Sequence, residues 1–376
     1  MDKTVHIYQN KGYDIVDIKK SLYHYFDRKF HFNNKKVLLK PNLLKAAAPE
    51  AHVTTHPILI EALVQYILDM GGKCVIGDSP AGWGIAHVKH VADVTGMTNI
   101  CDKYNIAFSY FDATEMRKMI IKTGVVFKEI FVAENYFDCD YVINVPKLKT
   151  HSLTVFTLGV KNMLGVVPGL HKKLFHEKGQ DPKRFAQAIC DLFSVVQPNV
   201  TVLDGIIGMH RNGPANGDPI PLGRIFISEQ TNALDAVVCR MCGVDPLQVP
   251  ITRAVHERGI GDIHNIPVQK EYSDHDDAFK SFQLHKIYKL RTNLPVQVFC
   301  CLFALFKYKP KINTSACTKC HKCVVICPTG ALSRTESYPQ LDLDKCVRCF
   351  CCCEICPTGA MSVDKNFFAK LVNEYQ

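Results

Sequence analysis

Short apolar runs alternate with segments of helical periodicity along residues 1–265. Residues 35–42, KKVLLKPN, are typical of a buried strand that breaks at Pro41. In residues 55–72 the apolar side chains recur three or four positions apart, as one face of a helix requires. Thr55 can cap this helix and Gly71 can end it. The alternation of strands and helices predicts an α/β layer fold.

Four of the predicted strands end in polar side chains. In open α/β sheets the carboxyl ends of the strands form the ligand crevice. If the four strands are parallel neighbours, their polar ends meet in one site; otherwise they are four ordinary solvent-exposed loop starts. Strand by strand, these residues are Lys40 and Asn42, then Asp78 and Ser79, then Lys147, Lys149 and His151, and finally Asp204.

Two later segments are rich in glycine. Residues 151–179 combine glycines with basic and amide side chains, among them Lys161 and Asn162. Small backbone and positive charge suit an anionic ligand such as a phosphate or carboxylate, although a solvated basic loop would have the same composition. Residues 208–223, GMHRNGPANGDPIPLG, are predicted to form a loop that is too long for a hairpin turn.

Three further signals are weak. The segment GDSPAGWG matches neither a dinucleotide fingerprint nor a phosphate-binding loop, so no nucleotide is predicted. His87 and His90 have helical spacing with Asp93, which favours a surface helix over a metal site. The segment that begins at Asp235, DAVVCRMCGV, is typical of a packed helix with buried thiols.

An internal repeat organises the C-terminal cysteines. CTKCHKCVVICPTGALS begins at Cys317 and CVRCFCCCEICPTGAMS begins at Cys346. Both copies contain C-x2-C-x2-C-x3-C-P, the spacing of bacterial two-cluster ferredoxins. The extra thiols Cys351 and Cys353 fall opposite Lys322 and Val324, so the repeat marks them as non-ligands. A zinc site would leave the doubled pattern unexplained.

The spacing predicts two [4Fe–4S] clusters. In this motif the fourth cysteine of each run binds the other cluster. The predicted ligands are therefore Cys317, Cys320, Cys323 and Cys356 for one cluster, and Cys346, Cys349, Cys352 and Cys327 for the other.

Composition narrows the class of protein. The net charge of +9 permits an anionic partner, but no basic run or aromatic motif indicates nucleic acid. The N-terminus lacks a signal-peptide core, and the most apolar run, residues 294–306, is too short to span a bilayer. It is expected to be a buried helix, with a membrane-surface contact as the alternative. Eighteen cysteines without an export signal predict metal binding in a reducing cytoplasm.

Several motifs occur together in a known order. VLLKPN, THP, GDSP, NVPKLKTH, GVKNMLG and DGIIGMHRNGP, followed by the cysteine repeat, resemble the uncharacterised iron–sulfur-centre proteins, whose large domain is the domain of unknown function 362. The resemblance covers roughly residues 36–262 and the ferredoxin segment. It implies an α/β body and cytoplasmic, mostly anaerobic, hosts, but no reaction.

The expected fold is a large α/β sandwich-type domain followed by a small α+β ferredoxin-like domain. The expected divisions are the α/β domain (1–265), a helical connector (266–310), the two-cluster ferredoxin domain (311–364) and a helical tail (365–376). Residues 311–364 hold six Lys and Arg against five Asp and Glu, whereas free ferredoxins of this type are usually strongly acidic. This balance predicts a segment docked on a larger body.

The sequence favours a ferredoxin-linked oxidoreductase or a component of one. The clusters would relay electrons from a partner protein to an anionic substrate or cofactor in the α/β crevice. Lys40, Asn42, Asp78, Lys161 and Asn162 are the predicted binding residues. Lys147, Lys149 and His151 are the predicted catalytic residues, the lysines offsetting charge and His151 delivering a proton. The alternatives are an electron carrier without enzymatic activity, whose α/β domain docks proteins, and a scaffold whose clusters are structural.

Overall fold

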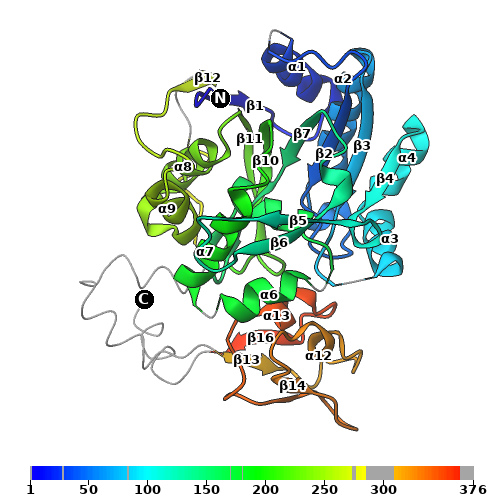
Figure 1. Cartoon of the computed structure of the whole chain (residues 1–376), viewed down its shortest axis with the longest axis vertical. Helices are drawn as coiled ribbons and strands as arrows, with labels where there is room; N and C mark the ends of the chain where they lie inside the picture. Colours follow the sequence, from blue (N-terminus) through cyan, green and yellow to red (C-terminus); the bar gives the residue numbers. More distant parts are fainter. Residues whose placement is uncertain are drawn as a thin grey trace.

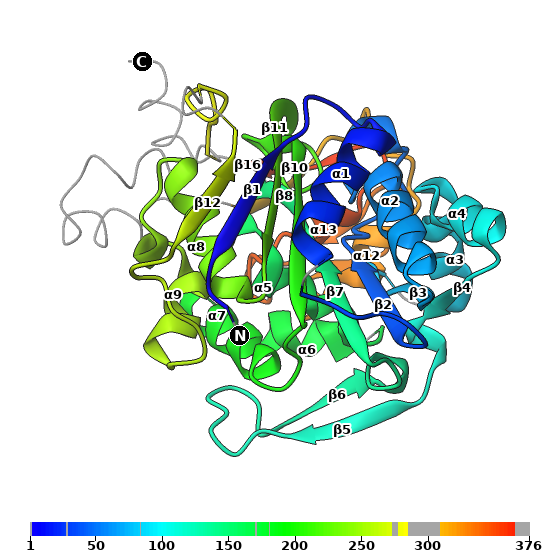
Figure 2. The same cartoon turned by 90° about the horizontal axis from the view of Figure 1, so that it is seen from above.

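The computed structural model describes residues 2–272, 277–284 and 309–364, apart from single positions at 28, 83, 170 and 180. Its centre is a mixed sheet with helices on both faces (Figures 1 and 2). The expected α/β class with a small C-terminal part is confirmed. Most of the expected connector, including the apolar run 294–306, and the tail from 365 lie outside the described residues.

The main sheet has the strand order β12-β1-β11-β10-β7-β2-β3-β4. Strands β10, β7, β2, β3 and β4 run parallel to their neighbours in this order, whereas β11 is antiparallel to β1 and β10. The short strands β8 and β9 pair beside β10. The bounds are β1 Val5–Gln9, β2 Lys36–Pro41, β3 Lys73–Asp78, β4 Ala107–Tyr110, β7 Tyr141–Val145, β8 Lys147–His151, β9 Val155–Thr157, β10 Val200–His210, β11 Asp218–Ser228 and β12 Val268–Glu271.

Alternating side chains of the strands pack into hydrophobic clusters on the two faces of the sheet. In β2, Val37 and Leu39 pack on one face, whereas Leu38 packs on the other. Because both faces are buried, the strand is a continuous apolar run, as is usual for parallel sheets. The first face is covered by α1 (Ile15–Phe26), α2 (Pro57–Asp69), α3 (Ile85–Val94) and α4 (Met97–Tyr104); the second by α5 (Gly159–Asn162), α6 (His171–Lys178), α7 (Pro182–Phe193), α8 (Thr231–Met241) and α9 (Pro250–Glu257).

Two expectations about local structure are wrong. Helix α2 is capped by His56, whose Nδ1 accepts a hydrogen bond from Ile58 N, and not by Thr55. The Thr55 hydroxyl instead donates to Val145 O at 2.6 Å and so ties the helix to β7. The expected loop at 208–223 is largely the hairpin of β10 and β11, whose strands are long enough to leave only residues 211–217 between them.

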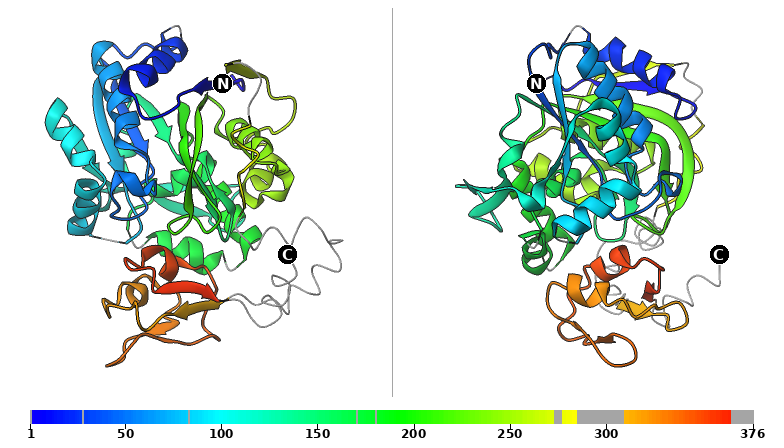
Figure 3. Two further views of the ribbon diagram at one scale, coloured as in Figure 1. Left: turned by 180° about the vertical axis from the view of Figure 1, so that it is seen from behind. Right: turned by 90° about the vertical axis from the view of Figure 1, so that its right-hand side faces the viewer.

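The C-terminal segment lies at one end of the α/β body, next to α6 (Figures 1 and 3). Its two short helices, α12 (Lys322–Ile326) and α13 (Cys351–Ile355), follow equivalent positions of the repeat. Its strands are β13 (Lys309–Ile312) with β16 (Met361–Asp364), and β14 (Leu332–Ser333) with β15 (Gln340–Leu341). A separate hairpin of the body is β5 (Met116–Ile120) with β6 (Glu129–Ala133). None of the described helices is long and apolar enough to cross a membrane.

Candidate functional site

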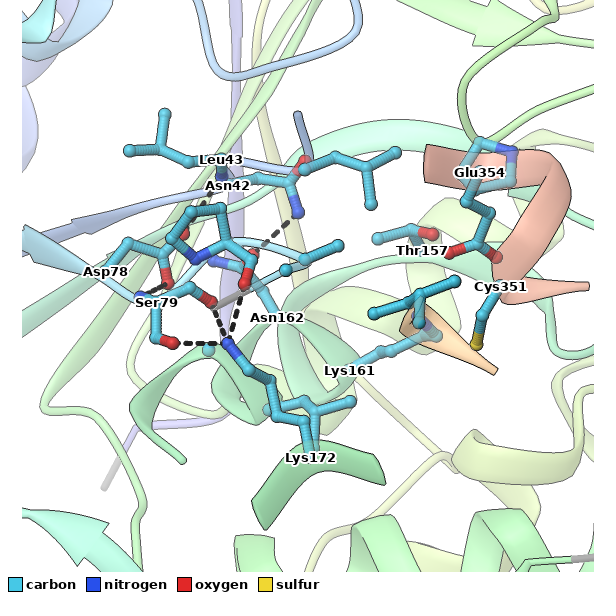
Figure 4. Close-up of a pocket in the computed structure, with 18 of the residues that line it drawn as sticks. Asn42, Leu43, Asp78, Ser79, Thr157, Lys161, Asn162, Lys172, Cys351 and Glu354 are labelled. Carbon is cyan, nitrogen blue, oxygen red and sulfur yellow. Dashed lines mark hydrogen bonds between the residues drawn. The ribbon is translucent and has the colours of Figure 1, made fainter. Parts of the chain in front are cut away.

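A cavity of about 120 Å³ lies between the α/β body and the C-terminal segment (Figure 4). The body contributes the carboxyl ends of β2 and β3, strand β8, and the residues of α5 and α6. The C-terminal segment closes the other side with Pro328, Cys351 and Glu354. The parallel neighbours β7, β2 and β3 thus bring polar residues from distant parts of the sequence to one edge of the sheet.

Lys40 and Asp78 form a buried ion pair at the floor of this cavity. Lys40 Nζ lies 2.8 Å from Asp78 Oδ1, and both side chains are almost fully buried. The second carboxylate oxygen of Asp78 accepts from Leu43 N at 2.9 Å. A buried pair with this many hydrogen bonds has little charge left for a ligand. Lys40 and Asp78 therefore shape the floor by fixing each other.

Lys147 does not line the cavity. Its ammonium is fully buried, 2.8 Å from Asp204 Oδ2 and 2.6 Å from the Tyr13 hydroxyl. The sequence predicts that both residues follow the ends of strands. In the structure Lys147 is the first residue of β8 and Asp204 lies inside β10, and the two residues are register partners in this parallel pair of strands. The pair is a structural element of the sheet.

Lys149 and His151 also lie in β8 rather than in a loop. Their two-residue spacing puts both side chains on the face of the strand that carries Lys147. Lys149 Nζ donates to Asn42 Oδ1 at 2.8 Å and to Val53 O at 2.7 Å, and it reaches the cavity wall. Burial, with Lys161 nearby, holds the pKa of Lys149 well below its usual range.

His151 is buried behind the cavity wall. Its Nδ1 accepts from Leu153 N at 3.0 Å, and its Nε2 lies 3.2 Å from Glu354 Oε1. Burial, together with Lys161, lowers the pKa of His151 to about 4. The ring is therefore neutral near pH 7 and is placed to hold Glu354.

Asn42 and Asn162 connect the strand ends to α5. Asn42 Nδ2 donates to Asn162 Oδ1 at 2.9 Å, and Asn162 Nδ2 donates to Asn144 Oδ1 at 2.8 Å. Helix α5 is itself anchored by buried Asp235, which accepts from Gly159 N and Val160 N. These hydrogen bonds fix the orientation of the three asparagine side chains. Lys161, which precedes Asn162 in α5, lines the cavity.

Lys161 and Lys172 bring positive charge from the glycine-rich segment. Within the described part of the chain, the Lys161 ammonium group has no hydrogen bond or ion pair. Lys172 donates to Ser79 and, at 2.8 Å, to Pro80 O. Burial lowers the pKa of Lys161, and it lowers that of Lys172 to about 8. An anion in the cavity would raise the pKa of both lysines and so favour their protonated forms, which attract the anion in turn.

Sequence reasoning missed Glu354 and Thr157 as cavity residues, and it included His176 only as one of the basic residues of the glycine-rich segment. Glu354 stands opposite Val325 in the cysteine repeat, so a charged residue at an apolar position was its only signal. The Thr157 hydroxyl and His176 Nδ1 are buried without a hydrogen-bond partner among the described residues. Unsatisfied buried polar atoms are uncommon in native proteins, and these two can each accept or donate a hydrogen bond to a molecule in the cavity. Another histidine, His87, belongs to α3 as expected and lies 2.6 Å from Ala81 O.

The eight repeat cysteines fall into two groups, each around its own small cavity. Cys317, Cys320, Cys323 and Cys356 line one, and Cys327, Cys346, Cys349 and Cys352 line the other. Each set takes three thiols from one run and the fourth from the other, in line with the predicted grouping. Four convergent thiols of this kind fit an iron–sulfur cluster.

The backbone around the two cavities is repeated as well. Lys319 and His321 have positive φ angles of 56°, and their repeat equivalents Arg348 and Phe350 have 54° and 60°. The same bend therefore wraps both cavities. The hydroxyl of Thr329 lies 3.9 Å from Cys327 Sγ, and Thr358 is placed likewise beside Cys356. Hydroxyls beside ligand sulfurs tune the potential of a bound cluster.

The fold and the cysteine geometry define an α/β iron–sulfur protein with an electron-transfer role. Residues 37–240, more than half of the chain, match the model described as Domain of unknown function (DUF362), so the chain belongs to this family. Residues 310–333 match the 4Fe-4S binding domain. The family expected from the motifs is confirmed.

The chain is also similar to one curated protein and, more weakly, to one solved structure. The thylakoid-associated protein sll1697 of Synechocystis sp. is 34% identical over 224 residues, which cover 59% of this chain and 67% of that protein. The lactate racemase apoprotein from Thermoanaerobacterium thermosaccharolyticum is similar with a TM-score of 0.42 and 11% identity, over 63% of this chain and 56% of that one. The second likeness is too low to carry an argument about function.

Proposed function

We propose that the chain is an iron–sulfur oxidoreductase, or a component of one, that transfers electrons between two [4Fe–4S] clusters and an anionic small molecule in the cavity. One observation carries the proposal: the cavity is lined both by the lysines of the α/β body and by residues next to the cysteines. Pro328 follows Cys327, and Cys351 precedes Cys352. An anion bound there would lie beside the second cysteine group.

The body supplies the binding groups. Lys149, which is buried, and Lys161 and Lys172, which are half-buried, bring three amines to the cavity, while Asn42 and Asn162 present amides held by their mutual hydrogen bond. Buried ammonium groups interact with an anion more strongly than surface charges do. These groups would also offset negative charge that develops on reduction. Of the predicted catalytic residues, we keep Lys149 in contact with substrate and assign Lys147 and His151 to positioning.

The first cysteine group offers an entry for electrons. Cys320 of this group is exposed, whereas the other seven repeat cysteines are buried or of intermediate exposure. A donor or acceptor protein would dock over the exposed group, and the clusters, when bound, supply single electrons. A simple carrier needs no buried amines beside its clusters, so the cavity favours an enzyme over a carrier.

The iron content tests the ligand assignment. After anaerobic reconstitution we expect about eight irons per chain, since each group of four cysteines suits one cube. Cys351→Ala and Cys353→Ala should keep this number, and Cys352→Ala should lower it. Loss of a cluster in Cys351→Ala with retention in Cys352→Ala would overturn the assignment.

Mass spectrometry of the anaerobically purified protein tests the enzyme function. We expect an anionic small molecule to co-purify with the wild type, and to be lost in Lys161→Gln and Lys149→Met while cluster absorbance stays unchanged. Lys89→Gln, on the exposed side of α3, is the matched control. Equal retention in all variants, or electron delivery to a protein partner with no bound anion, would instead establish the carrier.

A further inference from the structure

A group of metal-binding side chains adjoins the cavity and has no part in the eight-cysteine assignment. The Sγ atoms of Cys349 and Cys351 and an imidazole nitrogen of His176 all lie within 4.8 Å of one another. Cys351 begins α13, while His176 belongs to α6 of the body. The repeat leaves Cys351 without a role, because its equivalent in the first run is Lys322.

Two of these three residues, the ones that are not predicted cluster ligands, also line the cavity. Cys351 and His176 line it, together with Lys161 and Glu354 (Figure 4 shows all of these but His176). Stacking on Phe185, with ring centroids 4.8 Å apart, holds the imidazole in place. Its Nδ1 is buried without a hydrogen-bond partner among the described residues. A fixed imidazole with a free nitrogen beside two thiols is the arrangement of a metal ligand rather than of a packed ring.

We propose that His176, Cys351 and Cys349 bind one thiophilic divalent cation, with Cys349 as a thiolate shared with the neighbouring cluster. Two thiolates and one imidazole suit Zn²⁺ and similar borderline-soft ions. A tetrahedral ion with bonds of about 2.3 Å to sulfur and about 2.0 Å to nitrogen keeps its ligand atoms somewhat less than 4 Å apart. Ligand atoms that are at most 4.8 Å apart therefore need to approach one another by at most about 1.3 Å.

The position of this ion would define how the cavity holds its anion. Three protein ligands leave the fourth tetrahedral position open, as in catalytic rather than structural zinc sites. The ion would lie at the wall of the cavity that is also lined by Lys161 and by the unpartnered hydroxyl of Thr157, a residue that is 4% exposed. A carboxylate or phosphate oxygen would occupy the open position. Binding the ion converts the Cys351 thiol to a thiolate and releases one proton to solvent.

This inference rests on the proposed ligand assignment, in which Cys349 binds a cluster and Cys351 does not. The test uses anaerobically reconstituted full-length protein, titrated with Zn²⁺ and, as a spectroscopic probe, with Co²⁺. We expect one zinc per chain beyond about eight irons, and thiolate-to-cobalt charge-transfer bands. Cys351→Ser and His176→Gln should each weaken zinc binding about tenfold or more at unchanged iron content.

Two controls isolate the site. Cys353→Ser removes the neighbouring buried thiol, and His90→Gln removes an exposed histidine; both should bind zinc as the wild type does. Absence of extra zinc in the wild type, or equal binding in Cys351→Ser and His176→Gln, would overturn the site and leave the redox proposal standing. Loss of iron in Cys351→Ser would overturn the ligand assignment itself. His176→Gln, outside the cysteine runs, keeps the test decisive if Cys351→Ser does not fold.

Discussion

His151 of the α/β body and Glu354 of the C-terminal segment lie 3.2 Å apart, Nε2 to Oε1. Because Nδ1 of this imidazole accepts from Leu153 N, the neutral ring carries its proton on Nε2, the nitrogen that lies beside the carboxylate. Glu354 lies between Cys352 and Cys356, one from each cysteine group. A second link is the 2.7 Å hydrogen bond from Lys173 Nζ to Val325 O. These polar contacts fix the cysteine groups against the cavity.

Removal of the His151 side chain is expected to loosen this junction. In His151→Ala the Glu354 carboxylate, 12% exposed, loses the imidazole that lies 3.2 Å away, and leaving a buried carboxylate without this polar neighbour costs about 1–3 kcal/mol. Hydrogen exchange in α13 should therefore accelerate by about 5- to 150-fold under anaerobic conditions, with partial rescue in His151→Gln. His90→Ala, on the exposed side of α3, is the control. Unchanged exchange in α13 would show that Glu354 does not depend on His151.

The cysteine grouping could be predicted from the sequence because its information is local. Three ligands of each group lie within seven consecutive residues, and the repeat supplies the fourth by superposition. Strands β2 and β3 could be predicted for the same reason, since each is an unbroken apolar run before polar residues. The positions of Glu354 and His176 at the cavity could not be predicted, because they depend on the contact between the C-terminal segment and α6, which lie far apart in the sequence.

The charges of the crevice show a different limit. In the sequence, Lys147 and Lys149 are both basic residues near a strand end, and Lys161 is a basic residue of the glycine-rich segment that follows. Strand register decides between them: it sets Lys147 beside Asp204, whereas Lys161, on α5, has no carboxylate at bonding distance among the described residues. The spacing of residues along one strand does not show which residues lie opposite on the partner strand. A lysine that is paired with a carboxylate therefore could not be distinguished in the sequence from one that is not.

Lys147→Met is expected to destabilise the protein without emptying the cavity. The substitution leaves Asp204 buried, with the Tyr13 hydroxyl as its remaining side-chain donor, and breaking a buried pair on one side costs about 3–5 kcal/mol. Denaturant unfolding followed by circular dichroism measures this cost. The double variant Lys147→Met/Asp204→Asn should recover most of it, because no unpaired charge remains. A double variant as unstable as the single one would contradict the pairing.

Gly165→Ala is expected to disrupt the floor of the cavity. A Cβ atom at this position would collide with Asp78 Oδ1 and lie 2.5 Å from Lys40 Nζ, so the buried pair would have to separate. We expect a loss of at least about 2 kcal/mol in the free energy of unfolding, together with loss of the co-purifying anion. Gly12→Ala is the matched control, since its Cβ would have no atom within 4 Å. Equal stability of the two variants would show that the floor yields without cost.

The stability of the body is expected to fall between pH 6.5 and pH 4 because of His56. Its Nδ1 caps α2, its ring stacks on Tyr13 at 3.6 Å, and burial lowers its pKa to about 4, with Asp204 opposing and Lys147 adding to the shift. The folded state therefore resists a proton that the unfolded state accepts below about pH 6.5, so the stabilisation is complete above that pH and is lost as the pH falls toward 4.

His56→Asn isolates this contribution. Asparagine also caps helices well but does not titrate in this range, so the cap is kept while the pH dependence is removed. After allowance for the partial exposure of the ring, the wild type should lose about 1–2 kcal/mol more than the variant between pH 7 and pH 4.5. Urea unfolding of both proteins, followed by circular dichroism at the two pH values, measures the difference. The remaining histidines, including His52 stacked nearby, titrate in both proteins and cancel. Parallel losses in the two proteins would show that protonation of His56 is not coupled to folding.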